Sequence, residues 1–183
     1  QRNDRSAKDA YRLLDDASDA LQHNRDLLQI ALDQMEQGIT VFDKDLRLTC
    51  WNRQYRALFD LPDELGQVGV SLGRILAFLA RRGDILQPEE AATLDRLTTF
   101  GQSWELKLRT SGRIIELRSN PMPDGGIVAT YADITARVEA EAELKRINET
   151  LEQRVTTRTG ELVRVNEELA QAQKIAEEAN LGK

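Results

Sequence analysis

Residues 38–51 read GITVFDKDLRLTCW and set the architecture of the whole chain. Residues 38–43 alternate in polarity and are rich in β-branched side chains, which is typical of a strand. Asp43-Lys44-Asp45 predicts a turn, and the alternation resumes over 46–51, so the two halves predict a β-hairpin. One face of the second strand is predicted to carry Leu46, Leu48 and Cys50, and the other Arg47, Thr49 and Trp51.

Three helices are predicted after this hairpin. Asn52 is a favourable N-cap for a short helix that ends at Leu61-Pro62. Ser71 is a favourable N-cap for a second helix, which Gly83 terminates. Pro88 opens a third helix, because proline is well tolerated in the first turn.

The two-residue period then returns and predicts three further strands, at 104–109, 113–119 and 127–132. Two strands, a run of helices and three more strands indicate an α+β domain whose helices cover one face of an antiparallel sheet. The sequence therefore predicts a five-stranded antiparallel sheet with a belt of helices.

Composition divides the chain into three parts. Residues 37–133 hold eight of the nine aromatic residues, all four prolines and nine of the eleven glycines, as expected for a folded domain with loops. Residues 1–36 and 134–183 are rich in Ala, Leu, Glu, Arg and Gln, which is typical of long helices.

The first flanking helix carries apolar residues at alternating steps of three and four, which is a heptad seam. The seam includes Tyr11, Leu14, Leu21 and Leu28, and two polar residues interrupt it. Two interpretations stay open: the helix packs on its own domain, or it forms a parallel coiled coil with a second copy.

The last helix has a stronger seam, at Val155, Leu162, Val165 and Leu169, and a stutter precedes it. A helix of about 48 residues extends roughly 70 Å, which is more than a domain of this size can cover. We therefore expect a homodimer paired through these helices. Gly160 is a predicted weak point within the last helix.

Composition also excludes several classes of function. Acidic residues outnumber basic ones by 31 to 25, which disfavours a nucleic-acid-binding protein. One cysteine and one histidine are too few for a disulfide framework or a typical zinc site, so no metal is expected. The first residues are too polar for a signal peptide, and no apolar run is long enough to span a membrane. We therefore expect a cytoplasmic protein without direct membrane contact.

The order of elements, together with two motifs, resembles a PAS sensor domain over about 37–136. The stretch 37–52 is similar to the first hairpin of that family. Asp124-Gly125-Gly126-Ile127-Val128, followed by Ala132-Asp133-Ile134-Thr135, is similar to its last strand and its Asp-Ile-Thr exit motif. The resemblance implies that Asp133, Ile134 and Thr135 relay a signal from the sheet to the output helix. Asp133 is also a plausible ordinary cap of that helix.

A second resemblance lies downstream. Residues 151–162, LEQRVTTRTGEL, and 177–183, EEANLGK, resemble the linker before the phosphoacceptor helix of sensor histidine kinases. The chain contains neither the phosphoacceptor region nor an ATP-binding region, so it is expected not to be an enzyme itself. The resemblance implies a parent protein-histidine kinase that acts in a two-component phosphorelay, with a kinase core and a response regulator or phosphotransfer protein as partners.

Aromatic and polar residues in the domain form a candidate small-molecule pocket, or simply fill the core; they are Trp51, Asn52, Tyr55, Phe59, Phe78 and Trp104. No cofactor is predicted. Cys50 is expected to be a small buried residue rather than a flavin-adduct cysteine, and a flavin or small metabolite stays a minor alternative. His23 lies outside the domain, so haem is not expected. Arg82 and neighbouring arginines are expected to be solvated.

We thus interpret the chain as a signal-sensing and dimerisation module without a catalytic constellation. Two alternatives stay open. One is a constitutive, ligand-free dimerisation spacer. The other is a sensor for a different output, such as a nucleotide cyclase, although the linker at 151–162 argues against it.

Overall fold

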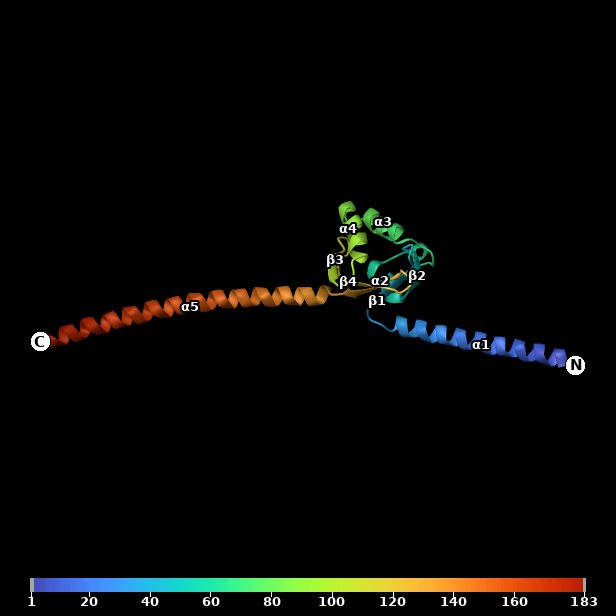
Figure 1. Cartoon of the computed structure of the whole chain (residues 1–183). Helices are drawn as coiled ribbons and strands as arrows, with labels where there is room; N and C mark the ends of the chain where they lie inside the picture. Colours follow the sequence, from blue (N-terminus) through green and yellow to red (C-terminus); the bar gives the residue numbers. More distant parts are fainter. Residues whose placement is uncertain (1, 183) are drawn as a thin grey trace. The chain divides into compact units, whose positions relative to one another are not determined.

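A computed structural model describes residues 2–182, in two compact units that meet between Thr135 and Ala136. The first unit contains a long helix and the α+β domain, and the second is the remainder of a second long helix (Figure 1). The first and last residues of the predicted flanking segments, 1 and 183, lie outside the described residues.

The domain is built on a five-stranded antiparallel sheet, which confirms the predicted fold class. Its strands are β1 (Gly38–Phe42), β2 (Leu48–Trp51), β3 (Ser103–Lys107), β4 (Ile114–Pro121) and β5 (Ile127–Asp133). Their order across the sheet is β2-β1-β5-β4-β3, and all neighbours are antiparallel. The first and last strands of the domain, β1 and β5, therefore lie side by side at the centre.

The predicted faces of the first hairpin were wrong because a bulge interrupts the alternation. Phe42 pairs with Leu48, and Val41 pairs with Cys50, so Thr49 is the extra residue. Leu48 therefore shares the core face with Phe42 and is fully buried, whereas Cys50 shares the opposite face with Val41 and is only half-buried. The strand also begins later than predicted, at Leu48.

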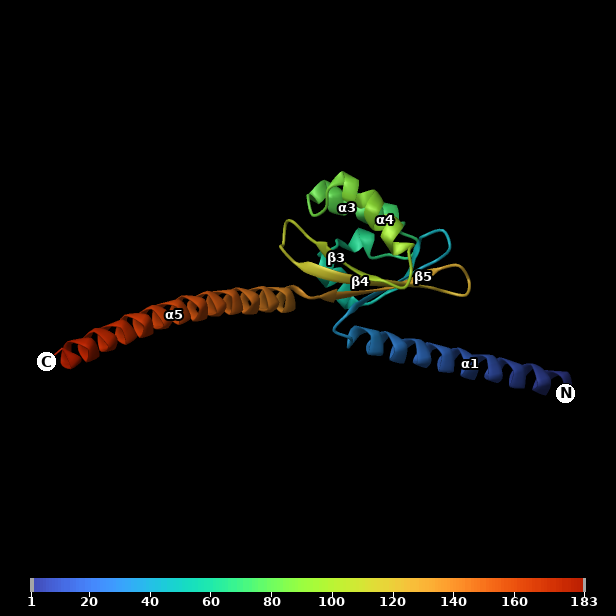
Figure 2. The same ribbon diagram turned by 60° about the vertical axis from the view of Figure 1, so that its left-hand side comes forward.

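The helical belt consists of α2 (Arg53–Phe59), a single 3₁₀ turn, η1 (Asp63–Leu65), and the helices α3 (Leu72–Arg82) and α4 (Gln87–Leu97). The predicted caps of α3 are present: the Ser71 hydroxyl accepts from Arg74 N, and Gly83 ends the helix with φ of 89°. Helices α3 and α4 lie together over one face of the sheet (Figure 2).

The core lies between this belt and the sheet. Helix α3 contributes four buried residues, Leu72, Ile75, Leu76 and Leu79, at the spacing of one helix face. Ile115 and Leu117 of β4 face them with exposures of 0% and 2%. Helix α2 lies especially close to β1: a Cβ added at Gly38 would be only 2.9 Å from Tyr55 Cα.

The two flanking helices are α1 (Arg2–Asp33) and α5 (Thr135–Leu181). Residues of the predicted seams are exposed in the single chain; Tyr11 is 71% exposed and Leu162 is 63% exposed. Helix α5 is continuous through Gly160. No helix within residues 2–182 is both long enough and apolar enough to cross a membrane.

Candidate functional site

The exit from the domain is held by a small set of hydrogen bonds around Thr135, the first residue of α5. Asp133 Oδ1 accepts from Thr135 N at 3.0 Å and from Thr135 Oγ1 at 2.5 Å. Ile114 N donates to the same Thr135 hydroxyl at 2.9 Å, and Ile114 O accepts from Ile134 N at 2.9 Å. Ile134 is buried. We call Asp133, Ile134 and Thr135, with their partner Ile114, the exit joint.

The electrostatics of the exit joint favour an ionised Asp133. Burial alone raises the pKa of this carboxyl, but the two hydrogen bonds from Thr135 and the positive charge of Arg113 together lower the pKa below its ordinary 3.8. The carboxylate therefore stays charged at neutral pH and caps the start of α5 as an anion, which suits the positive end of a helix.

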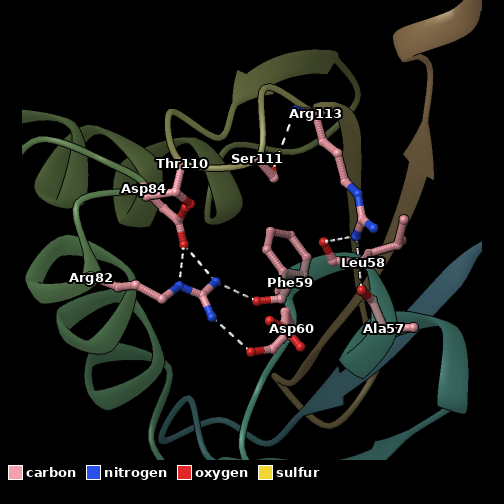
Figure 3. Close-up of polar contacts among 9 residues, drawn as sticks. All are labelled: Ala57, Leu58, Phe59, Asp60, Arg82, Asp84, Thr110, Ser111 and Arg113. Atoms are coloured by element: carbon pink, nitrogen blue, oxygen red, sulfur yellow. Dashed lines mark hydrogen bonds and ion pairs between the residues drawn. The ribbon is translucent and has the colours of Figure 1, made fainter.

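Arg113 connects this joint to helix α2. It lies one residue before Ile114, and its Nη1 donates to Ala57 O at 2.9 Å and to Leu58 O at 3.0 Å (Figure 3). These carbonyls belong to the last turn of α2, whose carbonyls have no partner within the helix. A guanidinium is well placed there because the C-terminal end of a helix carries partial negative charge.

A second arginine caps the next two carbonyls (Figure 3). Arg82 Nη2 donates to Phe59 O at 2.5 Å, and Arg82 Nη1 donates to Asp60 O at 2.7 Å. Its Nε donates to Asp84 Oδ2 at 2.6 Å, and Asp84 also accepts from the hydroxyl of Thr110. Asp84 is completely buried. The expectation that Arg82 is a solvated surface residue was therefore wrong.

Asn52 holds the other end of α2. Its Oδ1 accepts from Tyr55 N at 3.2 Å, as an N-cap does, and from Ile39 N of β1 at 2.9 Å. Its Nδ2 donates to Leu32 O at 2.8 Å and to Gln37 O at 2.9 Å, so the buried side chain also ties down the end of α1.

Two of the six candidate pocket residues, Tyr55 and Phe59, line an internal cavity between belt and sheet. The cavity has a volume of about 20 Å³, and its wall consists of eight apolar residues and the hydroxyl-bearing Tyr55, Thr93 and Tyr131. This volume is enough for about one water molecule, whereas ligand pockets usually measure about 300–1,000 Å³.

The other four candidates do not line this cavity. Asn52 and Trp51 border an open surface depression near the end of α1. Trp104 borders a different depression, between α4 and β3, where the Arg96 guanidinium lies 5.5 Å from its ring centre. Phe78 packs against the outside of the core, beneath the Arg82 guanidinium. The sequence pattern grouped all six side chains by type, but the fold distributes them over four places.

The aromatic residues that do meet form a packed cluster. The Tyr131 ring lies 5.1 Å from that of Tyr55 and 5.3 Å from that of Phe59. Tyr131 OH and Thr40 Oγ1 are hydrogen-bonded at 3.0 Å. Burial raises the pKa of Tyr131 to about 12, and it raises the pKa of Tyr55 as well. Both phenols therefore stay neutral at physiological pH.

The single histidine and the possible metal ligands do not gather at these contacts in the part of the chain that the structure describes. His23 is exposed on α1, away from the core residues. Among the residues that the structure describes, no group of three or more His, Cys, Asp or Glu side chains could hold a metal ion.

Comparisons with known proteins bear on the domain. Residues 32–142 match the family model described as the PAS fold. A stretch of 124 residues, 67% of this chain, is 27% identical to the Non-motile and phage-resistance protein of Caulobacter vibrioides, of which it covers only 13%.

Solved structures with a similar fold include the PAS domain of BvgS from Bordetella pertussis. That domain is 18% identical, with a TM-score of 0.44 over 72% of this chain and 98% of the other. A domain of a sensory box sensor histidine kinase/response regulator from Geobacter sulfurreducens is 20% identical, with a TM-score of 0.39 over 62% of this chain and 96% of the other.

Proposed function

The chain belongs to the PAS fold family, and on this premise we propose that it is the sensing and dimerisation module of a sensor histidine kinase. In this function the domain changes conformation in response to a stimulus, and the exit joint passes the change to α5. The observation that carries the proposal is that the hydrogen bonds of Thr135 tie the first residue of α5 directly to β4 and β5.

Dimerisation is proposed to occur through the long helices. The seam residues of α5 that we expect to meet a second copy are 51–64% exposed; they are Val155, Leu162, Val165 and Leu169. Removing such a stripe from water favours association, and a parallel pair of identical helices covers it with matching side chains.

The kinase output is inferred from the linker resemblance at 151–162, and the partners of the parent are proposed to be a kinase core and a response regulator or phosphotransfer protein. Seams with a stutter have two closely related packings, which suits a helix pair that must switch between outputs.

A ligand-free dimerisation spacer is the second candidate, and the small internal cavity favours it. We propose no resident cofactor, because a flavin or haem needs a far larger cavity than the one between belt and sheet. The two candidates differ in whether the exit joint matters for output.

The test is Asp133→Asn in the intact kinase that contains this chain, with Glu105→Gln on an exposed part of β3 as the matched charge control. We expect D133N to change autophosphorylation severalfold and E105Q to leave it unchanged. Unchanged output in D133N favours the spacer. Light scattering of the 183-residue chain should give the mass of a dimer, and a monomer at tens of micromolar contradicts the coiled coil.

A further inference from the structure

Helix α2 is held at its start by the end of α1, which leads into the domain, and at its end by Arg113, which directly precedes β4. At its start, Asn52 Nδ2 binds Leu32 O of α1, and Asp33 Oδ1 accepts from Arg53 N at 2.9 Å. At its end, Arg113 binds the carbonyls of Ala57 and Leu58. The helix has seven residues and spans only about 10 Å, so both attachments act on one rigid element.

The attachment of Arg113 is adjacent to the exit joint in the sequence and in space. The next residue, Ile114, bonds Thr135 through its N–H and Ile134 through its carbonyl. The guanidinium of Arg113 also acts on the Asp133 carboxylate through its charge. A movement of the Arg113 backbone or side chain therefore changes the surroundings of Asp133, Ile134 and Thr135 together.

We propose that Arg113 is the positioning residue that couples helix α2 to the exit joint, so that a displacement of the end of α1 reaches Thr135 through α2 and Arg113. The proposal rests on the proposed signalling function and adds an input route to it. This route does not pass through the internal cavity, which Arg113 does not line.

The coupling has two alternative arrangements. In the structure, Arg113 binds the α2 carbonyls, and Asp133 is free to cap Thr135. If α2 moves away, the released guanidinium is attracted to the Asp133 carboxylate, whose charged form it already stabilises. Asp133 must then divide its acceptor capacity between Arg113 and Thr135, which weakens the cap at the start of α5.

Close packing restricts the directions in which α2 can move. A Cβ added at Gly38 would lie 2.9 Å from Tyr55 Cα, so the helix already packs against the β1 backbone as closely as the absence of a side chain allows. A push from α1 is therefore directed toward the end of α2 where the arginines bind, because packed interiors transmit strain rather than absorb it.

The first experiment measures amide hydrogen exchange of Ile134 and Thr135 by NMR in the 183-residue chain. We expect Arg113→Gln to speed exchange at both amides roughly tenfold, as loss of a charge-assisted contact does. It should also raise the pKa of the Asp133 carboxyl toward its ordinary value, and Arg113→Lys should restore much of both. Arg118→Gln, an exposed arginine on β4, the strand that begins just after Arg113, is the matched control. Equal effects of R113Q and R118Q overturn the proposal.

The second experiment tests the input side. Asp33→Ala removes the acceptor of Arg53 N and should speed exchange at the exit joint severalfold, but add nothing in an R113Q background. Ser71→Ala removes the comparable cap of α3 and should leave the joint unchanged. If D33A acts equally with and without Arg113, or if S71A acts as strongly, the route is wrong. Because D133N in the kinase tests the signalling function separately, the two can fail independently.

Discussion

Asn52→Ala should remove the main attachment of α2 and unfold the domain at markedly lower denaturant. The amide oxygen serves Ile39 N and Tyr55 N, and the whole side chain is inaccessible to water. Losing an N-cap costs about 1 kcal/mol. Leaving the Ile39 N–H unpaired in a partly buried position costs about 1–3 kcal/mol more. We add nothing for the carbonyls of Leu32 and Gln37, because Leu32 is only half-buried and Gln37 is exposed. The free energy of unfolding should therefore fall by about 2–4 kcal/mol.

The measurement is urea unfolding followed by tryptophan fluorescence at a fixed protein concentration. Both tryptophans, Trp51 and Trp104, lie in the domain, so the signal reports its unfolding. Asn120→Ala is the matched control, because Asn120 is exposed on β4 and its loss should change stability by less than about 0.5 kcal/mol.

Asn52→Asp tests the acceptor and the donor of the amide separately. It keeps the oxygen that accepts from Ile39 and Tyr55, but it places a carboxylate oxygen against the carbonyls of Leu32 and Gln37, so we expect destabilisation here too. A loss below about 1 kcal/mol in N52A, or equal losses in N52A and N120A, would contradict the role assigned to this side chain.

Further predictions follow from individual groups. Burial raises the pKa of Tyr131 to about 12 in the folded chain, whereas the unfolded chain loses this proton near pH 10. The contribution of Tyr131 to the free energy of unfolding should therefore be complete below about pH 10 and fall between about pH 10 and 12. Tyr131→Phe should make the fall of the urea midpoint over this range less steep. The pKa of Asp133 is lowered, so the stability that this carboxylate contributes has the opposite pH dependence: it is present above about pH 4 and lost as the pH falls. Amide exchange of Ile134 and Thr135 should therefore become faster at low pH than the intrinsic exchange rate alone predicts. Gly126→Ala places a Cβ in steric clash with Phe42 O and should lower the free energy of unfolding in urea by about 1–3 kcal/mol. Gly160→Ala meets no neighbour within 4 Å and should stabilise α5 by about 1 kcal/mol, measured by thermal circular dichroism.

The sequence was sufficient for the fold because periodicity and turn chemistry agree along the domain. Alternation located the strands, and Asn52, Ser71 and Gly83 marked helix ends that the structure contains. The bulge at Thr49 was not predictable in the same way, because it depends on how β2 pairs with β1. One extra residue was enough to move Cys50 from the expected core face to the other.

The site was less accessible to sequence reasoning because its most important contacts join side chains to distant backbone. Arg113 binds carbonyls 55 and 56 residues earlier in the chain, and any residue type supplies a carbonyl. No pattern of residue types signals such a contact. The only available hint was the position of Arg113 just after the turn at Gly112, where an arginine is unremarkable.

The two routes by which a stimulus could enter this domain meet at the last turn of α2. A ligand of ordinary size would have to enlarge the 20 Å³ cavity, and α3, which contributes four residues to its wall, would have to move outward. Arg82, at the end of α3, donates to Phe59 O and Asp60 O, so an outward movement of α3 displaces the end of α2. Arg113 donates to the two preceding carbonyls of the same turn. A push from α1 arrives at the same turn through α2 itself. Either input therefore changes the geometry at Arg113 before it reaches the exit joint. For this reason a mutation of Arg113, rather than of the cavity wall, should impair signalling while leaving the domain folded.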